Sequence, residues 1–161
     1  MDDINDVQNV EVASEGKQYI VVHLGSEQYG IDIKYIDNIV RMSKITRIPM
    51  SQKYFKGVIN LRGEIIPVMS LRLKFDLVPD EYTNATRIII IKLESQSAIG
   101  IIVDEVKEVV TLDEASIEKP NSADANDIRM QYLSGVGKHV DGLITLLNIS
   151  SVINDKEKEM V

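Results

Sequence analysis

The sequence predicts an all-β protein made of two tandem five-stranded β-barrel lobes with short helical turns. Runs of about four to eight β-branched residues, bounded by Gly, Pro, Asn and Ser, recur along the chain and are typical of strands. About five such runs fall in each half, and the two halves repeat one pattern. Short strands at this spacing favour closed or nearly closed barrels, because closure removes the edges that the isoleucines at residues 88–91 would otherwise expose.

The repeat orders the strands along the chain. Residues 19–24 form an apolar run, a polar turn follows, and residues 30–40 form a second run; residues 88–93 and 100–110 repeat this hairpin. A period of about seventy to eighty residues is too long for a solenoid. Two copies of one small β unit, similar to SH3 or OB barrels, therefore explain the pattern best.

The second part of each copy also recurs. Residues 57–58 lead to an apolar run at 65–71, and residues 135–136 lead at the same spacing to a run at 143–149. The repeat is therefore ordered, and it is not a coincidence of apolar runs.

Four segments predict short helical turns. Residues 51–57 begin with Ser51, a favourable N-cap, and end at a glycine; residues 127–135 are a weaker counterpart. Residues 71–75 and 149–153 follow predicted strands and begin further turns.

The duplication predicts one domain at residues 17–153, with a first lobe at about 17–78 and a second at about 85–153. Residues 79–84 are polar and form the expected linker between the lobes. Composition predicts three flexible segments, namely residues 1–16, 118–127 and 154–161.

Composition excludes several classes of function. A formal net charge of −7 and a pI near 4.9 argue against nucleic-acid binding, which needs Lys and Arg concentrated on one face. The absence of cysteine excludes disulfides and thiolate metal sites. The amino terminus is acidic where a secretory signal is basic, and no apolar run approaches the roughly 18 residues of a membrane span. We therefore expect a soluble, cytoplasmic protein without direct membrane insertion.

Catalytic and metal-binding patterns are missing from the sequence. His23 and His139 are the only histidines, and neither has a local partner at catalytic spacing. The glycines at 135–137 lack the lysine and hydroxyl of a phosphate loop, and residues 124–127 lack the glycine and glutamate of a calcium loop. The adjacent carboxylates at 104–105 are interpreted as a solvated edge. We expect no enzymatic activity, no cofactor and no metal.

Two apolar stripes recur at matching places in the copies. After an alternating strand, apolar residues follow at Ile36 and Ile39, and the second copy has Val106 and Val109. The change from a period of two to a period of three marks a bulge or a helical turn that leaves the sheet. Either these four residues belong to the core, or the stripes line a groove between the copies that accepts a partner helix. The residues alone leave both alternatives open.

Residues 57–68 form an apolar block with one arginine at a predicted hairpin turn. Ile65, Ile66 and Val68 are expected in a core strand, whereas Asn60 and Arg62 lie where the chain reverses. Arg62 has three possible roles: a surface charge, a brace that hydrogen-bonds nearby carbonyls, or a planar fork for a partner carboxylate.

Four ordered blocks, at residues 29–33, 57–68, 100–104 and 132–137, carry a family resemblance. The chain resembles the CheW-like domains of bacterial chemotaxis over about residues 17–153. The resemblance implies two five-stranded β-barrel lobes and a scaffold without enzymatic activity. Such a scaffold bridges the cytoplasmic tip of chemoreceptors, a helical hairpin, to the regulatory domain of the histidine kinase CheA, in arrays beneath the inner membrane.

The resemblance also implies a partner-binding site. The four stripe residues match the receptor groove, and the adjoining turn residues complete the set: Ile36, Ile39, Gly57, Asn60, Arg62, Gly63, Val106 and Val109. One departure is Asn38, which stands where many members have a glutamate. An ion pair from that position to Arg62 is therefore excluded unless Asp37 substitutes.

Two other interpretations fit parts of the sequence less well. The same module could serve another scaffold of the CheV type, but the sequence shows no receiver domain after the second lobe. A barrel that binds single-stranded nucleic acid would need a basic groove with aromatic platforms, and the chain is acidic with few aromatic residues and no Trp.

Overall fold

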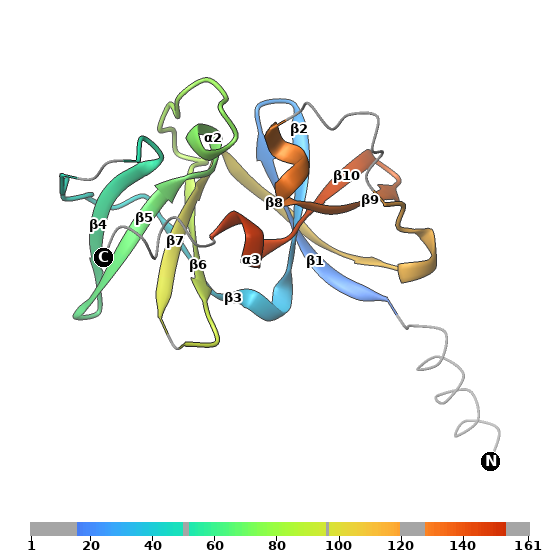
Figure 1. Ribbon diagram of the computed structural model, residues 1–161, viewed down its shortest axis with the longest axis horizontal. Coiled ribbons are helices and arrows are strands. Elements are labelled where there is room, and N and C mark those ends of the chain that lie inside the picture. The colour runs from blue at the N-terminus through green and yellow to red at the C-terminus, as the bar shows by residue number, and fades with distance from the viewer. Residues whose placement is uncertain (1–15, 50–51, 96, 120–127, 154–161) are drawn as a thin grey trace, which may run out of the picture.

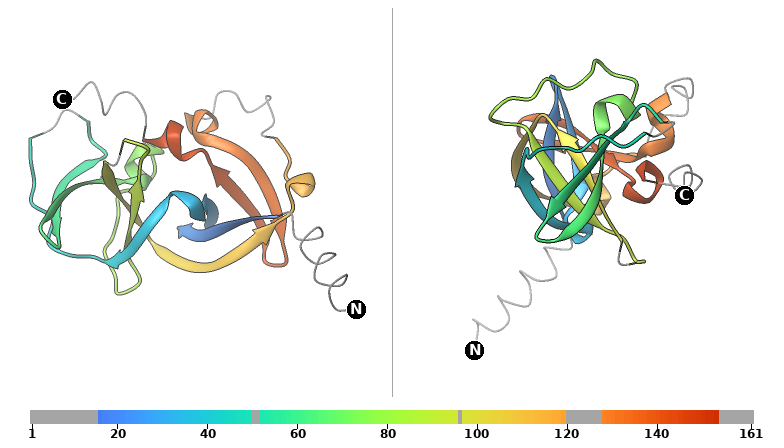
Figure 2. Two further views of the ribbon diagram at one scale, coloured as in Figure 1. Left: turned by 90° about the horizontal axis from the view of Figure 1, so that it is seen from below. Right: turned by 90° about the vertical axis from the view of Figure 1, so that its left-hand side faces the viewer.

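The computed structural model describes residues 16–49, 52–95, 97–119 and 128–153. Two five-stranded sheets lie side by side along the long axis of the molecule (Figures 1 and 2). The predicted β architecture with two lobes is confirmed. Within the described ranges, no helix is long and apolar enough to cross a membrane.

Sheet I has the strand order β8-β1-β2-β10-β9. Its strands are β1 (Lys17–Leu24), β2 (Glu27–Asp32), β8 (Glu105–Leu112), β9 (Leu133–His139) and β10 (Gly142–Leu147). Sheet II has the order β3-β6-β7-β5-β4. Its strands are β3 (Ile36–Arg41), β4 (Phe55–Leu61), β5 (Glu64–Ser70), β6 (Arg87–Lys92) and β7 (Ala98–Val103).

The two sheets share one plan, but the repeats exchange their hairpins. The β1–β2 hairpin of the first copy lies in sheet I with β8, β9 and β10, and the β6–β7 hairpin of the second copy lies in sheet II with β3, β4 and β5. The parallel pairs β10–β2 and β5–β7 join the exchanged hairpins to their sheets. The predicted lobes at 17–78 and 85–153 therefore do not coincide with the sheets.

The chain changes sheet at two short connections. In the first copy, the 3₁₀ turn η1 (Ile33–Tyr35), capped by Asp32, leads from β2 into β3. In the second copy, Asp104 alone separates β7 from β8. The predicted helical turn that leaves the sheet is thus present in the first copy.

In neither sheet does a continuous ladder of hydrogen bonds join the first strand to the last, so the prediction of closed barrels is wrong. One isolated bridge instead joins the two ends of each sheet: Thr46, after β3, pairs with Val58 of β4, and Glu118, after β8, pairs with Val136 of β9. Residues 42–45 after β3 and 113–117 after β8 are not strand, so each pairing is limited to a single bridge.

The helical turns agree with the sequence in part. Helices α2 (Leu71–Lys74) and α3 (Ile149–Val152) are confirmed, and Ser70 and Asn148 cap them. The turn predicted at 51–57 is confirmed in part: the Phe55 amide donates to the Gln52 carbonyl at 3.3 Å and closes a turn, but from Phe55 onward the chain is already strand β4. Ser51 lies outside the described residues. The described part of the chain has two further 3₁₀ turns, η2 (Glu114–Ser116) and η4 (Ile128–Tyr132), the latter within the predicted segment 127–135.

The predictions for the linker and for the three flexible segments have mixed outcomes. The polar linker at 79–84 contains no strand or helix. The segments predicted to be flexible lie mostly outside the described residues, which include only Gly16 and residues 118–119 of them.

The central strands are buried on both faces. In β6, Ile88 and Ile90 pack inside the sheet II lobe, whereas Ile89 and Ile91 join a second cluster that draws side chains from both sheets. β1 alternates in the same way between the sheet I interior and this shared core. Each fully buried Ile contributes about 1.5–3 kcal/mol. The two sheets therefore form one folding unit around the shared core.

Hydrogen bonds to Asp104 also join the two sheets. Arg72 of α2 donates from Nε to Asp104 Oδ1 at 2.8 Å and from Nη2 to Oδ2, and the Gly25 amide in the β1–β2 turn donates to Oδ2 at 2.7 Å. Burial acts to raise the pKa of Asp104, but the hydrogen bonds from Arg72 and Gly25 outweigh it, and this pKa lies below its ordinary value. Asp104 is therefore not part of the solvated edge that the sequence indicated.

Candidate functional site

The two apolar stripes lie on β3 and β8, the strands that follow the change of sheet. Each is an edge strand, β3 of sheet II and β8 of sheet I. Ile36, Ile39 and Val106 are half-buried and pack against the shared core, whereas Val109 keeps 49% of its surface exposed. The stripes are thus neither fully core nor fully free surface.

Bulges explain why the apolar period changes in the stripes. The β3–β6 register shifts between Ile36 and Asn38, and the β1–β8 register shifts so that Val21 faces Glu108 while Val22 faces Val106. One extra residue on each bulged strand turns the following side chains to a new face. The bulge that the sequence predicted is therefore present in both copies.

The β4–β5 hairpin ends in a tight turn at Arg62 and Gly63. Their φ angles are 54° and 87°, which suits the two-residue turn with left-handed central positions. The Gly63 amide donates to Asn60 Oδ1 at 2.9 Å, so Asn60 braces the turn. Ile66 and Val68 are buried as predicted, but Ile65 is 59% exposed, because it faces away from the core that Ile66 enters.

Arg62 is exposed and makes no hydrogen bond or ion pair with any other residue in the described part of the chain. Asp37 therefore does not replace the missing glutamate as its partner there. Since Asn60 braces the turn, the guanidinium is left to solvent or to a binding partner. Figure 1 shows the tip of the β4–β5 hairpin and β3 along the same lower side of the molecule.

Gly57 is buried, and its backbone explains why it is glycine. Its φ is 138°, and a Cβ atom built on it would lie 2.1 Å from the Thr46 carbonyl oxygen. The lack of a side chain lets Thr46 exchange two backbone hydrogen bonds with Val58, of 2.8 and 2.9 Å. Gly57 therefore fixes the segment after β3 against β4.

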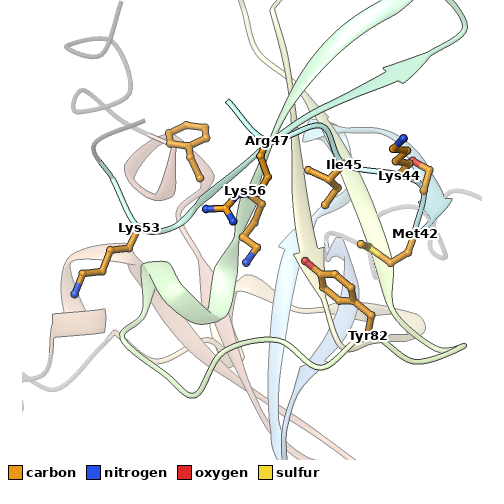
Figure 3. A pocket seen from close by; sticks show the side chains of 9 residues that line it. Met42, Lys44, Ile45, Arg47, Lys53, Lys56 and Tyr82 are labelled. Atoms are coloured by element: carbon orange, nitrogen blue, oxygen red, sulfur yellow. The ribbon is translucent and has the colours of Figure 1, made fainter. Parts of the chain in front are cut away.

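A half-open pocket, which the sequence did not indicate, lies where that segment crosses β4 (Figure 3). Its volume is about 530 Å³, and nine residues line it: Met42, Ser43, Lys44, Ile45, Arg47, Lys53, Phe55, Lys56 and Tyr82. Four of the nine are cations and none is a carboxylate. Charge scattered over segments without regular structure leaves no pattern in the sequence.

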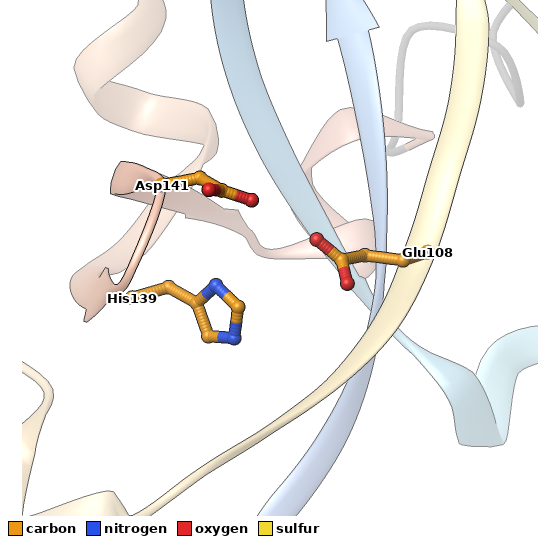
Figure 4. Close-up of side chains that lie close together, drawn as sticks. All are labelled: Glu108, His139 and Asp141. Carbon is orange, nitrogen blue, oxygen red and sulfur yellow. The ribbon is translucent and has the colours of Figure 1, made fainter.

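Among the described residues, one cluster of metal-type donors joins β8, an edge strand of sheet I, to the end of β9, the opposite edge strand (Figure 4). Donor atoms of Glu108, His139 and Asp141 lie within 4.8 Å of one another. The Lys107 ammonium lies 2.9 Å from Asp141, and its hydrogen bond holds the pKa of Asp141 below the ordinary value. Because Lys107 already neutralises Asp141 and two of the three residues are exposed, the cluster is better explained as a surface ion-pair network.

Comparison with known proteins agrees with this geometry. The sequence profile of the CheW-like domain family matches residues 18–157. The chain belongs to the CheW-like family. It is 33% identical to the chemotaxis protein CheW of Klebsiella aerogenes, over 91% of this chain and 87% of that protein. It is 34% identical to the chemotaxis protein CheW of Bacillus subtilis, over 88% and 89% of the two chains.

A solved CheW structure has the same fold. The scaffolding protein TtCheW from Thermoanaerobacter tengcongensis superposes with a TM-score of 0.77 at 34% identity, and the match covers 87% of this chain and 89% of TtCheW. The CheW-like family is a family of chemotaxis scaffolds and adaptors. The family that the sequence blocks indicated is therefore confirmed.

Proposed function

We propose that this chain is a non-enzymatic adaptor that couples the cytoplasmic tips of chemoreceptors to the histidine kinase CheA in signalling arrays beneath the inner membrane. One observation carries the proposal beyond family membership. The two copies present matching apolar stripes on edge strands of different sheets, each placed by a bulge at the same point of the repeat.

The stripes suit a helical partner. Ile36 and Ile39 on one edge strand and Val109 on the other expose apolar surface beside the shared core. A receptor tip is a helical hairpin, and an amphipathic helix buries its apolar face in such a groove. Val106 is half-buried and packs against the same core.

The β4–β5 turn supplies the polar part of the site. Arg62 has an exposed guanidinium without a partner among the described residues, so it can offer two parallel donors to a partner carboxylate. Gly57, Asn60 and Gly63 contribute by holding the hairpin and its turn in place.

Signalling then arises from many modest interfaces. The regulatory domain of CheA is itself CheW-like, so the two can alternate in rings. Joining weak contacts in a lattice raises their effective concentration, and a change in receptor state can then shift the populations of kinase geometries.

The proposal is tested by binding a receptor cytoplasmic fragment to Val109→Asp and to a matched control, Val140→Asp. Val140 is 91% exposed in the β9–β10 turn, outside the stripes. A charge placed in an apolar interface must be desolvated without a partner, which costs about 2 kcal/mol or more and weakens binding at least about tenfold. The control should bind like the parent.

Melting temperature is measured beside binding, because Val109 pairs with Ile20 across the β1–β8 ladder. If Val109→Asp folds normally and binds the receptor fragment as tightly as the parent, the stripes do not form the receptor groove.

A further inference from the structure

The basic pocket after β3 has a charge opposite to that of the chain as a whole. The protein carries a formal net charge of −7, yet four cations gather around this pocket without a lining carboxylate. The cations come from two segments: Lys44 and Arg47 follow β3, whereas Lys53 precedes β4 and Lys56 lies in it. The pocket lies outside the apolar stripes and the β4–β5 turn, so the proposed adaptor site does not account for it.

These cations are not used to stabilise the described part of the fold. Within it, none of the four makes an ion pair or a side-chain hydrogen bond; only Lys56 acts at a distance, lowering the pKa of the nearby Asp80 carboxyl against the larger effect of burial. Like charges held around one cavity repel one another, and an anion in the cavity relieves that repulsion. The surplus charge therefore favours an anionic occupant.

The pocket walls are fixed by the fold. The Thr46–Val58 bridge holds the crossing segment on β4, where Gly57 admits it. Met42 and Ile45 pack against the interior of the sheet II lobe, and Phe55 packs against the shared core. The backbone and the apolar part of these walls are therefore preorganised, so an occupant has to order only the cationic side chains.

The distribution of charge distinguishes an extended anion from a compact one. Figure 3 shows Lys53 and Lys44 toward opposite ends of the pocket, with Arg47 and Lys56 between them. Apolar surface of Ile45 and the ring of Tyr82 lie in the same cavity. A single phosphate would need donors that converge on one point, whereas spaced carboxylates around an apolar side chain match spaced cations around an apolar wall.

We propose that this pocket binds an acidic peptide segment of a partner protein, with carboxylates beside the four cations and one apolar side chain against the wall between them. The binding is part electrostatic and part apolar, so it weakens with salt but is not abolished by it.

The probe is a fluorescein-labelled Glu-Glu-Leu-Glu-Glu-Leu-Glu peptide, and fluorescence anisotropy measures its binding to the full chain. The variant pair Lys44→Glu with Lys53→Glu reverses charge at the two ends of the pocket, where both side chains are exposed. Lys138→Glu, an exposed residue of β9 in the other sheet, is the control for a charge reversal elsewhere. We expect binding to fall by at least about tenfold in the pair and by less than about twofold in the control.

Two further probes separate the classes of occupant. A peptide with Gln in place of every Glu should not bind, and one with Ser in place of both Leu should bind about threefold more weakly. Three results would overturn the proposal: no binding of the acidic peptide, equal loss in the pair and in Lys138→Glu, or tighter binding of inorganic phosphate or a single-stranded oligonucleotide at the same residues. Melting temperature shows that each variant is folded.

Discussion

Gly57→Ala should destabilise the protein far more than Gly63→Ala, although both glycines belong to the same hairpin and both have positive φ. The new methyl group at residue 57 would meet the Thr46 carbonyl oxygen at 2.1 Å, which backbone atoms cannot tolerate. The methyl group at residue 63 would meet no atom within 4 Å. The pair therefore isolates the effect of close backbone approach.

The expected loss follows from two contributions. Holding alanine at a glycine-type φ costs about 1–3 kcal/mol at either position. At residue 57 the crossing segment must also move away, and the two Thr46–Val58 hydrogen bonds, worth about 1 kcal/mol each, are lost. We expect a loss of about 3–5 kcal/mol for Gly57→Ala and about 1–3 kcal/mol for Gly63→Ala.

Urea denaturation monitored by circular dichroism measures both variants. With a slope of about 2 kcal/mol per M, the midpoint should fall by about 2 M for Gly57→Ala and by about 1 M for Gly63→Ala. Equal midpoints for the two variants would refute the reasoning, because they would show that Thr46 does not depend on the missing Cβ.

Three further predictions concern charged groups. Arg62→Ala should weaken receptor binding without loss of stability. Arg62→Lys should weaken binding nearly as much, because lysine keeps the charge but lacks the planar guanidinium. If lysine restores binding, the role of Arg62 is purely electrostatic. The pKa of Asp104 is lowered from its ordinary value of 3.8, so its contribution to stability is complete only well above that pH and is lost as pH falls through the lowered pKa. Acid titration of stability should lose this step in Asp104→Asn, and an unchanged titration would contradict the stabilising role of the Arg72–Asp104 pair. Burial raises the pKa of Asp80, so its charge costs stability once pH exceeds that raised pKa. Asp80→Asn should therefore raise the urea midpoint at pH 7 if the bond to Ser70 is kept, and a lower midpoint would contradict this.

Much of the fold could be predicted from local patterns. Runs such as Ile88–Ile91 are β-branched and bounded by turn residues, so strand formation follows from the residues themselves. The caps of α2 and α3 are likewise local, since Ser70 and Asn148 accept hydrogen bonds three residues ahead. The internal repeat predicted the two-lobed plan, and the family blocks agreed with it.

The exchange of hairpins could not be predicted in this way. The sequence of a short connection does not show whether the next strand stays in the same sheet or leaves it. This applies to the connection from β2 to β3 and to the single residue between β7 and β8. Which sheet the next strand joins depends on which partner strands bury its apolar face, and those partner strands are distant in the sequence. The same holds for Asp104, whose partner Arg72 is 32 residues away.

The candidate site was predicted unevenly for the same reason. The stripes were visible because a bulge leaves a local change of period at Ile36 and Val106. The separate roles of Asn60 and Arg62 in the turn became clear only from the side-chain contacts. The basic pocket was missed because its cations come from two segments that the Thr46–Val58 bridge brings together.

The most direct test of the proposed adaptor function is receptor-dependent activation of CheA in a reconstituted mixture of receptor-containing membranes, the kinase and this chain. We predict that phosphorylation by the kinase rises with the amount of chain added, that Val109→Asp abolishes the rise, and that Val140→Asp leaves it unchanged. Kinase activity that does not depend on added chain, or that Val109→Asp supports as well as the parent, would contradict the proposed coupling.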